Sequence, residues 1–389
     1  MRTYADRATL FRKVYRLMSR RYSIFVTVLF CAFLFGFGIA HFILPDKDFS
    51  EQENRYLSQF KAPTPDTLRS GKFMEDFEDY ITDQFPLRDQ WIRLKALSER
   101  TLGKQENNGV YFGTDGQTLF AQYTAPGADD LAQRVGFVNK LADNLDVPVY
   151  FSLVPDKSYV WADRLPANAP NVDDGSVNET VKALVNERLN YIDLYGALRG
   201  DDVFYRTDHH WSTMGAYMAY LHLAGDMGGS ATILDSEPTL VSDSFYGTTW
   251  SSCGAGWVKP DEIYTWVPEG AFLVTRYPEG APIESTLYDL SKLETKDKYS
   301  MFLGGNQPLC VIRNPLVEGG KKLLVIRDSY SDSLAPFLAL DYQEVHLFDL
   351  RYNNMSLKQY VADNGIDRVL VLYSASNFST DANLFKLGY

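Results

Sequence analysis

The sequence predicts an α/β domain with a largely parallel sheet, preceded by one N-terminal transmembrane helix. The helix is indicated by an uncharged, strongly apolar segment at residues 24–44. The domain is indicated by short apolar runs rich in β-branched residues at 322–326, 344–348 and 368–373, with helical segments between several of them. These runs lack polar alternation, which is typical of strands covered on both faces. Such alternation of helix and strand favours a parallel sheet, whose functional loops leave the carboxyl ends of its strands.

The composition excludes several classes of protein. The chain has 389 residues, of which 45% are hydrophobic and 23% charged, so it can bury a full core and is neither disordered nor polytopic. It carries 38 basic and 50 acidic residues, and this net charge of −12 argues against nucleic-acid binding, which needs a basic face. Three cysteines are too few for a disulfide scaffold or a four-thiolate zinc site.

The apolar segment at residues 24–44 has 21 consecutive uncharged residues, and about 20 suffice to cross the hydrocarbon core. Seven basic residues and one acid precede it, and acids follow it. The positive-inside rule therefore places residues 1–21 in the cytoplasm, a signal anchor at 22–45, and everything after about Pro45 outside the cell membrane. A cleaved signal peptide is the alternative, but its apolar region is usually about 7–15 residues long.

This topology bears on the cysteines. Cys31 lies inside the span, whereas Cys253 and Cys310 lie outside, where a disulfide can persist. Two free, buried thiols fit the sequence equally well.

The part outside the membrane divides into a stalk with a helical and hairpin lead-in at 46–125 and a catalytic domain at 126–389. Between about 240 and 310 the periodicity fails, and we expect an aromatic-rich, β-rich or looped insertion. The lead-in is expected to hold a helix at 73–81 stopped by Pro86, a helix from Leu87 stopped by Gly103, and a hairpin at 110–120. The domain is expected to open with helices at 131–145, 177–189 and 212–227 and strands at 147–154 and 191–195.

Two short motifs contain residues suited to nucleophilic catalysis. Asp208 and His210 come just before Ser212, a suitable N-cap for the following helix, so they lie on the loop that enters it. Ser329 directly follows the strand at 322–326, where the N–H groups of a helix start can face a developing oxyanion. A serine nucleophile needs a base, and the base needs an orienting acid; Ser329, His210 and Asp208 supply all three.

Most of residues 46–389 resembles the DHHW protein family of Gram-positive bacteria, named for the residues that here are Asp208-His209-His210-Trp211. That family is similar to the AlgJ/AlgX-type polysaccharide O-acetyltransferases, which have an SGNH-hydrolase-like fold. The resemblance includes Glu53-Asn54-Arg55, Asp83-Gln84-Phe85-Pro86-Leu87-Arg88-Asp89, Val154-Pro155-Asp156-Lys157, Phe302-Leu303-Gly304-Gly305-Asn306, Asp328-Ser329-Tyr330-Ser331 and Asp349-Leu350-Arg351.

The resemblance implies an SGNH-hydrolase-like three-layer fold and assigns acid, base and nucleophile to Asp208, His210 and Ser329. His209 occupies the variable position of the motif. The glycine of the related Gly-Asp-Ser turn is Arg327 here, a departure that bears on the local oxyanion geometry. Asn306 is the candidate oxyanion donor on chemistry alone.

Three further residues are weaker candidates for substrate contact. Trp250 belongs to an aromatic cluster that suits sugar stacking or a local core. Arg351 suits an anionic group or a neighbouring acid, and Tyr330 adjoins the nucleophile. No third histidine stands near His209 and His210, so we expect no metal.

The sequence thus indicates a membrane-anchored, extracytoplasmic O-acetyltransferase that moves an acetyl group through a serine onto a cell-surface or secreted polysaccharide. Acetyl-CoA is not expected outside the membrane, so no cofactor is expected. The resemblance implies a multispanning membrane acyltransferase as the partner that delivers the acetyl group. A carbohydrate acetylesterase with the same triad and a non-catalytic scaffold of a polysaccharide-modification complex are the alternatives.

Overall fold

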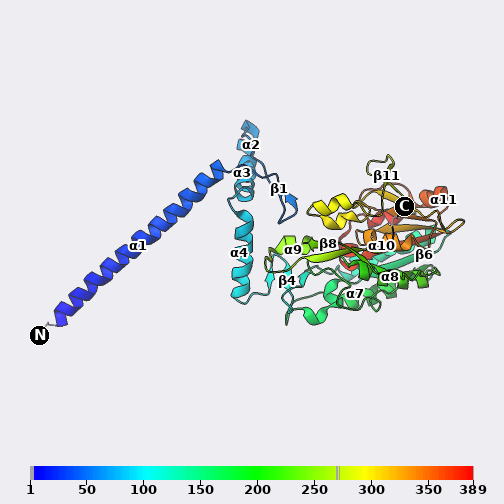
Figure 1. Cartoon of the computed structure of the whole chain (residues 1–389), viewed down its shortest axis with the longest axis horizontal. Coiled ribbons are helices and arrows are strands. Elements are labelled where there is room, and N and C mark those ends of the chain that lie inside the picture. The colour runs from blue at the N-terminus through cyan, green and yellow to red at the C-terminus, as the bar shows by residue number, and fades with distance from the viewer. Residues whose placement is uncertain (1–3, 269, 271, 389) are drawn as a thin grey trace. The chain divides into compact units, whose positions relative to one another are not determined.

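The computed structural model describes residues 4–268, 270 and 272–388, with side chains from residue 19 onward. The chain forms two compact units, Met1–Lys95 and Ala96–Tyr389 (Figure 1). Of the basic residues that precede the apolar segment, only Arg20 and Arg21 have described side chains. Arg2 lies outside the described residues altogether.

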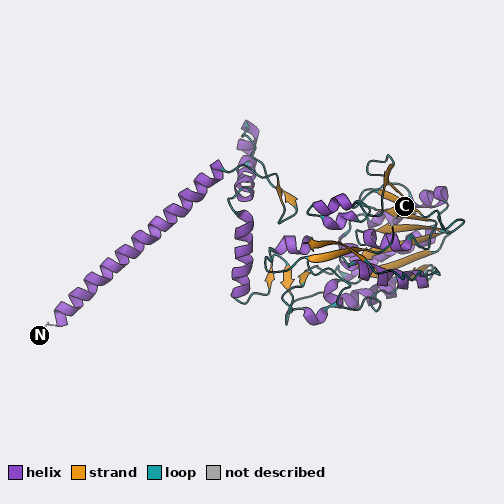
Figure 2. Cartoon of the chain, viewed as in Figure 1, coloured by secondary structure: helices purple, strands orange, loops and turns teal. Residues whose placement is uncertain are grey.

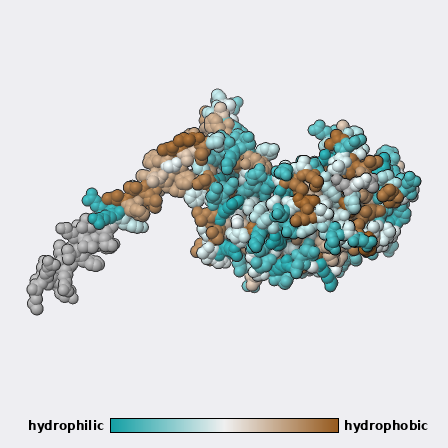
Figure 3. Space-filling view, viewed as in Figure 1, coloured by the Kyte–Doolittle hydropathy of each residue, from teal (hydrophilic) through white to brown (hydrophobic). Residues whose placement is uncertain are grey.

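The first unit begins with a long helix, α1 (Tyr4–Ile43). Its apolar part, Ser19–Ile43, has a mean hydropathy of 2.4, and it is the one helix among the described residues long and apolar enough to cross a membrane. Figure 3 shows most of this part of α1 in the brown and tan of hydrophobic residues. The predicted apolar helix is confirmed, whereas its orientation across the membrane stays a prediction.

Short elements follow α1 in the first unit. The predicted stalk holds a small antiparallel hairpin, β1 (Phe49–Ser50) with β2 (Arg55–Tyr56), and a short helix, α2 (Pro65–Ser70). Two amphipathic helices come next, α3 (Lys72–Asp83) and α4 (Arg88–Thr101), at the predicted places.

Two of the motifs noted in the sequence, at residues 53–55 and 83–89, meet in this unit as ion pairs. Both guanidinium Nη atoms of Arg55 donate to the carboxylate of Asp83, at 2.9 and 2.5 Å. Arg88 pairs with Glu53 in the same way. Hydrogen bonds from Arg55 lower the pKa of the buried Asp83 to about 2 against the opposing effect of burial. These motifs therefore tie the hairpin to the end of α3.

The second unit is built on an eight-stranded sheet in the order β11-β10-β12-β14-β13-β15-β6-β7 (Figure 2). From β14 to β7 all neighbours are parallel, and β12, β10 and β11 extend the other edge antiparallel. The strands are β6 (Val149–Val154), β7 (Leu189–Tyr191), β10 (Leu273–Arg276), β11 (Ile283–Ser285), β12 (Leu309–Arg313), β13 (Lys322–Arg327), β14 (Glu344–Phe348) and β15 (Arg368–Ser374).

Helices cover both faces of this sheet. In β13, Leu323 and Val325 pack in one core cluster, and Leu324 and Ile326 pack in the other. This division confirms the predicted three-layer α/β fold with a largely parallel sheet. The first cluster includes α8 (Thr213–Asp226) and α10 (Ser331–Leu338), and the second includes α5 (Ala128–Asn144), α7 (Asp174–Leu184), α11 (Leu357–Asn364) and α12 (Ala375–Thr380).

One predicted boundary is wrong. The helix expected at 177–189 ends at Leu184, and Leu189 already belongs to β7, which stops at Tyr191 instead of residue 195. Asn139 of α5 explains the early end, because its side chain donates to the Leu184 carbonyl and accepts from the Asn186 N–H. A side chain from another helix thus ends α7.

The segment at about 240–310, which the sequence indicates as a β-rich or looped insertion, contains several strands. It holds the hairpin β8 (Thr239–Phe245) with β9 (Asp261–Thr265), the short helix α9 (Thr248–Cys253) between them, and the strands β10 and β11 of the central sheet. Within the described residues Cys253 and Cys310 are free and buried.

The predicted lead-in hairpin belongs to the second unit. It forms a three-stranded sheet of β3 (Glu106–Asn107), β4 (Val110–Phe112) and β5 (Leu119–Ala121). Val110, Phe112 and Leu119 pack with Trp250 of α9 in a small core of their own. The hairpin therefore lies in the second unit, which begins at Ala96, whereas the catalytic domain was predicted from residue 126.

The Arg55–Asp83 pair gives a first testable prediction. Arg55→Ala removes the bidentate partner of a buried carboxylate, and we expect the local free energy of opening at the hairpin to fall by about 1–2 kcal/mol, since Arg55 is partly exposed. Hydrogen exchange should therefore quicken at residues 49–58. Arg69→Ala, at an exposed arginine of α2, is the control, and equal exchange in the two variants would contradict a structural role for the motif.

Candidate active site

Three predicted catalytic side chains form one continuous line of hydrogen bonds. Ser329 Oγ lies 2.7 Å from His210 Nε2, and His210 Nδ1 lies 2.6 Å from Asp208 Oδ2. Asp208 and His210 are buried, whereas Ser329 is half-buried. The fold therefore brings together a nucleophile, a base and an acid from segments 119 residues apart.

Ser329 stands just beyond the carboxyl end of β13, between that strand and α10. The carboxylate of Asp328 fixes this turn: one oxygen accepts from the Tyr330 N–H at 3.0 Å, and the other accepts from the Ser374 N–H and the Asn377 side chain at 2.8 Å each. Asp328 thus fastens the nucleophile turn to the start of α12, beyond the neighbouring strand β15.

The loop that carries Asp208 and His210 is held by the buried Lys157. Its ammonium donates to the carbonyls of Tyr205, Arg206 and Asp208 at 3.0, 3.2 and 2.7 Å. Burial lowers the pKa of Lys157 to about 8, against the raising effect of nearby carboxylates. Lys157 ends the motif Val154-Pro155-Asp156-Lys157, so its motif was visible in the sequence but its role was not.

A second anchor comes from β9. Asp261 Oδ2 accepts from the Thr207 N–H at 2.7 Å and from the Thr207 hydroxyl at 2.6 Å, and Asp261 Oδ1 pairs with Arg206 Nε at 3.0 Å. The residue directly before Asp208 is therefore fixed on both its backbone and its side chain. No local sequence signal pointed to Asp261.

The second oxygen of Asp208 is also satisfied. Asp208 Oδ1 accepts from the N–H and the hydroxyl of Thr248, each at 2.7 Å. The preceding Gly247 comes so close that a Cβ built on it would lie 2.2 Å from the Asp208 Cβ. Only glycine allows the start of α9 to approach the acid this closely.

Aromatic side chains fix the base and its loop. The rings of His210 and Tyr299 stack with centroids 3.8 Å apart and an angle of 8° between their planes. The Tyr299 hydroxyl donates to the Ser329 carbonyl at 3.1 Å, and Trp211 Nε1 donates to the Tyr330 carbonyl at 3.0 Å. The imidazole is thus held against the nucleophile turn.

The electrostatics suit a neutral base beside an ionised acid. The two histidines hold the pKa of Asp208 well below its usual range, although burial opposes this. Burial, aided by the neighbouring charge of His209, lowers the pKa of His210 to about 4. For His209 the charge of Asp208 outweighs burial and raises the pKa. His210 is therefore unprotonated near neutral pH and can accept the Ser329 proton.

His209 stands apart from the line of hydrogen bonds. It is partly exposed, and its Nδ1 lies 2.7 Å from the Thr248 hydroxyl. Candidate ligand atoms of Asp208, His209 and His210 lie within 4.8 Å of one another, a spacing that fits a metal ion. However, both ring nitrogens of His210 already hydrogen-bond to Asp208 and Ser329. The expectation that no metal binds here stays a prediction.

Asn306 is held by the residue that replaces the expected glycine. Arg327 is fully buried, and its Nη1 donates to Asn306 Oδ1 and pairs with Asp332 Oδ1, both at 2.8 Å. The exposed Asn306 is thereby oriented with its carbonyl oxygen engaged and its Nδ2 left as the donor. The Ser329 N–H has no hydrogen-bond partner among the described residues. These two N–H donors are the candidate oxyanion groups.

The other predicted substrate contacts are engaged within the protein. Tyr330 is buried and its hydroxyl donates to the His209 carbonyl at 2.5 Å. Trp250 is buried in the small core below β4 and donates to the Ala255 carbonyl at 2.9 Å. Arg351 forms a bidentate ion pair with Asp349 at 2.9 and 2.6 Å. Each residue thus has a structural partner, and a substrate role for any of them stays a prediction.

The chain is similar in sequence to several known proteins. A family profile described as "DHHW protein" matches residues 157–348. The protein named "Probable alginate O-acetylase AlgJ" from Pseudomonas syringae is 25% identical over 196 residues, which cover 47% of this chain and 50% of that protein. The protein of the same name from Pseudomonas aeruginosa is 27% identical over 168 residues, which cover 40% of this chain and 43% of that protein. The chain spans about half the length of the curated relatives it matches.

Solved structures show the same fold. A DHHW family protein from Eubacterium siraeum superposes with a TM-score of 0.63 at 22% identity, covering 72% of this chain and 95% of that one. Bacillus cereus PatB1 with a sulfonyl adduct gives 0.60 at 21% identity, with 71% and 97% covered. The profile match at residues 157–348 confirms that the chain is similar to the DHHW family, as its motifs predicted.

Proposed function

We propose that the chain is a membrane-anchored O-acetyltransferase that transfers an acetyl group, by way of Ser329, to a hydroxyl group of a cell-surface or secreted polysaccharide. The observation that carries this proposal is the unbroken line from Ser329 Oγ through His210 to Asp208, with distances of 2.7 and 2.6 Å. The relatives named alginate O-acetylase support the acetyl group and the polysaccharide acceptor.

In the first half-reaction, Ser329 Oγ attacks the acetyl carbonyl of the donor while His210 Nε2 takes its proton. The oxygen of the tetrahedral intermediate gains negative charge, and in this proposal the Ser329 N–H and Asn306 Nδ2 donate hydrogen bonds to it. The donor's leaving group then takes the proton from His210, and the acetyl group stays on Ser329 as an ester.

In the second half-reaction, a sugar hydroxyl occupies the place of the departed leaving group. His210 removes its proton as its oxygen attacks the acetyl-serine, and the same proton returns to Ser329 when the ester breaks. Asp208 keeps the imidazole in the tautomer with its proton on Nδ1 and stabilises the imidazolium that forms in each half-reaction.

The donor side follows from the membrane segment. With α1 as a single-pass anchor and its basic end in the cytoplasm, the triad faces the outside, where acetyl-CoA is not expected. A multispanning membrane acyltransferase that hands over the acetyl group fits this arrangement. Hydrolysis is the competing outcome, because water can reach the half-buried Ser329.

The triad predicts a ranking of variants on an activated acetyl ester such as p-nitrophenyl acetate. Ser329→Ala should abolish turnover, and His210→Ala should nearly do so, because an unassisted serine hydroxyl is a weak nucleophile. Asp208→Asn should lower kcat by as much as about 10⁴-fold. Thermal unfolding checks that each variant is folded, and full activity in Ser329→Ala would refute the serine mechanism.

The pH profile gives a second prediction. Turnover needs neutral His210, so it is lost as the pH falls through the pKa of that residue, which burial and His209 place below the usual 6.5. The acidic limb of kcat/KM should therefore lie below pH 6.5. His209→Ala removes a charge that lowers the pKa of His210, so the acidic limb should move to higher pH. Activity at neutral pH should change little. His222→Ala, at an exposed histidine of α8, is the control; a limb unmoved by His209→Ala would contradict this role.

Gly247 gives a third prediction. In Gly247→Ala the new methyl group would overlap the Asp208 side chain, and displacement of the acid should cut turnover by about 10²-fold. Gly136→Ala, in α5 with no atom within 4 Å of the new Cβ, makes the same change away from the triad and should be neutral or stabilising. Equal activity in the two variants would show that the close approach is unimportant.

A further inference from the structure

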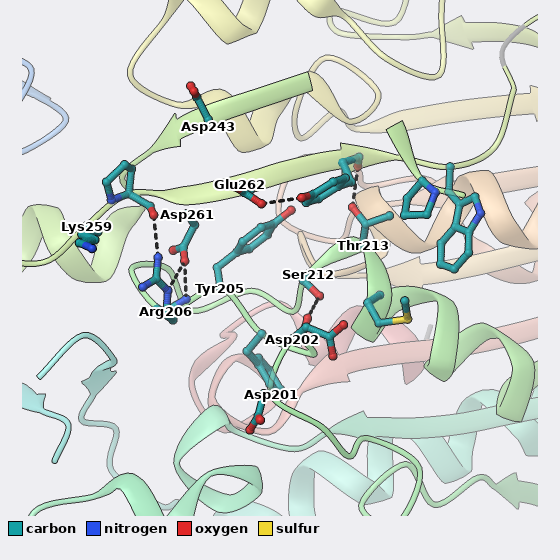
Figure 4. Close-up of a pocket in the computed structure, with 16 residues that line it drawn as sticks. Asp201, Asp202, Tyr205, Arg206, Ser212, Thr213, Asp243, Lys259, Asp261 and Glu262 are labelled. Atoms are coloured by element: carbon teal, nitrogen blue, oxygen red, sulfur yellow. Dashed lines mark hydrogen bonds and ion pairs between the residues drawn. The ribbon is translucent and has the colours of Figure 1, made fainter. Parts of the chain in front are cut away.

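A cavity of about 680 Å³ lies beside the loop that carries Asp208 and His210 (Figure 4). Tyr205 and Arg206 of that loop line it, together with Thr213 at the start of α8 and residues of β9. Ser329, His210 and Asp208 do not line it. Its size is typical of small-molecule sites. The cavity is therefore separate from the triad but shares a wall with the loop that holds the acid and the base.

One part of the lining is aromatic. The rings of Phe204, Tyr264 and Trp266 contribute to it. Tyr264 and Trp266 are only partly buried, so their rings are accessible. The C–H face of a sugar ring packs on such aromatic surfaces, while its hydroxyl groups seek the polar groups at the edge.

The polar part of the lining has an excess of negative charge. Asp261 is paired with Arg206, and Asp201 with Arg164. Three further exposed carboxylates line the cavity, and no ion pair engages them among the described residues: Asp202, Asp243 and Glu262. Among the described residues that line the cavity, Lys259 is the only cationic side chain that forms no ion pair. Such a lining repels uronates and phosphates and favours an amine.

A buried, unsatisfied hydroxyl points independently to a polar ligand. Tyr205 is 3% exposed, and its Oη has no hydrogen-bond partner among the described residues. The hydroxyl of the nearby Thr213 donates instead to the Tyr264 carbonyl at 2.6 Å. Figure 4 shows the Tyr205 side chain reaching into the middle of the lining residues. A buried hydroxyl without a partner is costly, and a ligand group can satisfy it.

The geometry points to a glycan subsite for an amine-bearing sugar: the cavity binds a hexosamine unit of the acceptor polysaccharide. This inference rests on the proposed function and specifies its acceptor. The amine meets the carboxylates of Asp202, Asp243 and Glu262, the ring packs on the aromatic side chains, and a hydroxyl or amine group pairs with Tyr205 Oη. A chain bound there lies against the loop of Asp208 and His210, which keeps its neighbouring units close to the site of acetyl transfer.

Calorimetric titration of the full chain in detergent tests the subsite with three probes: a glucosamine tetramer, its N-acetylated counterpart and a galacturonate tetramer. We expect the glucosamine tetramer to bind at least about tenfold more tightly than the N-acetylated one, because acetylation removes the positive charge. The galacturonate tetramer should not bind. Equal affinity for the glucosamine and N-acetylated tetramers would overturn the inference.

Tyr205→Phe is the sharpest variant, because it removes a buried hydroxyl of the lining and keeps the aromatic ring. The melting temperature should therefore hold while affinity for the glucosamine tetramer falls about three- to tenfold. Tyr195→Phe is the matched control, since it removes another buried tyrosine hydroxyl, which lies outside the cavity. Likewise Glu262→Gln should weaken binding and Glu318→Gln, at an exposed acid elsewhere, should not. Unchanged affinity in Tyr205→Phe or Glu262→Gln would overturn the subsite.

Turnover of the activated ester by the same wild-type preparation separates the two proposals. Ser329-dependent turnover without glucosamine binding would overturn the subsite and leave the proposed function standing. Glucosamine binding that Tyr205→Phe weakens, in a chain without Ser329-dependent turnover, would support the cavity as a sugar site and contradict the acetyltransferase.

Discussion

The proposed catalytic arrangement depends on a buried cation, the ammonium group of Lys157. Transfer of a charge out of water is costly, and three carbonyl groups of the Asp208 loop offset that cost as charge-assisted acceptors. The same bonds prevent the loop from adopting other conformations, because each would leave both an ammonium and several carbonyls unsatisfied. Lys157, which lies outside the hydrogen-bonded line of Ser329, His210 and Asp208, thus helps to hold the loop of the proposed acid and base.

Ser329, the proposed nucleophile, is held in place by the central sheet. β13 ends at the Asp328 turn, whose carboxylate is fastened to the start of α12, so Ser329 has little freedom to move. Trp211 donates to the Tyr330 carbonyl, and Tyr299 stacks on the His210 ring and donates to the Ser329 carbonyl. These contacts join the turn of Ser329 to the loop of Asp208 and His210. Because these contacts orient the serine and the imidazole before substrate binds, the proposed reaction needs little free energy to orient them.

The sequence predicted the parts that depend on local pattern. The strands at 322–326, 344–348 and 368–373 were predictable because short apolar runs rich in β-branched residues favour buried strands. Asp208, His210 and Ser329 were predictable as candidates because their residue types together suit nucleophilic catalysis. The supports of the site were not visible. Lys157, Asp261 and Thr248 reach the loop from 40 to 54 residues away, and the pattern of a segment does not report such distant contacts.

The central claim, that Ser329 carries the acetyl group, is tested most directly by trapping it. The full chain is mixed with an activated acetyl ester, quenched in acid and digested, and the peptide containing Ser329 is examined by mass spectrometry. The account predicts acetyl on Ser329 that builds up without an acceptor, decays when an oligosaccharide is added as acetyl appears on the sugar, and is absent in His210→Ala. Product formed with no acetyl on Ser329, or with acetyl on another residue instead, would contradict it.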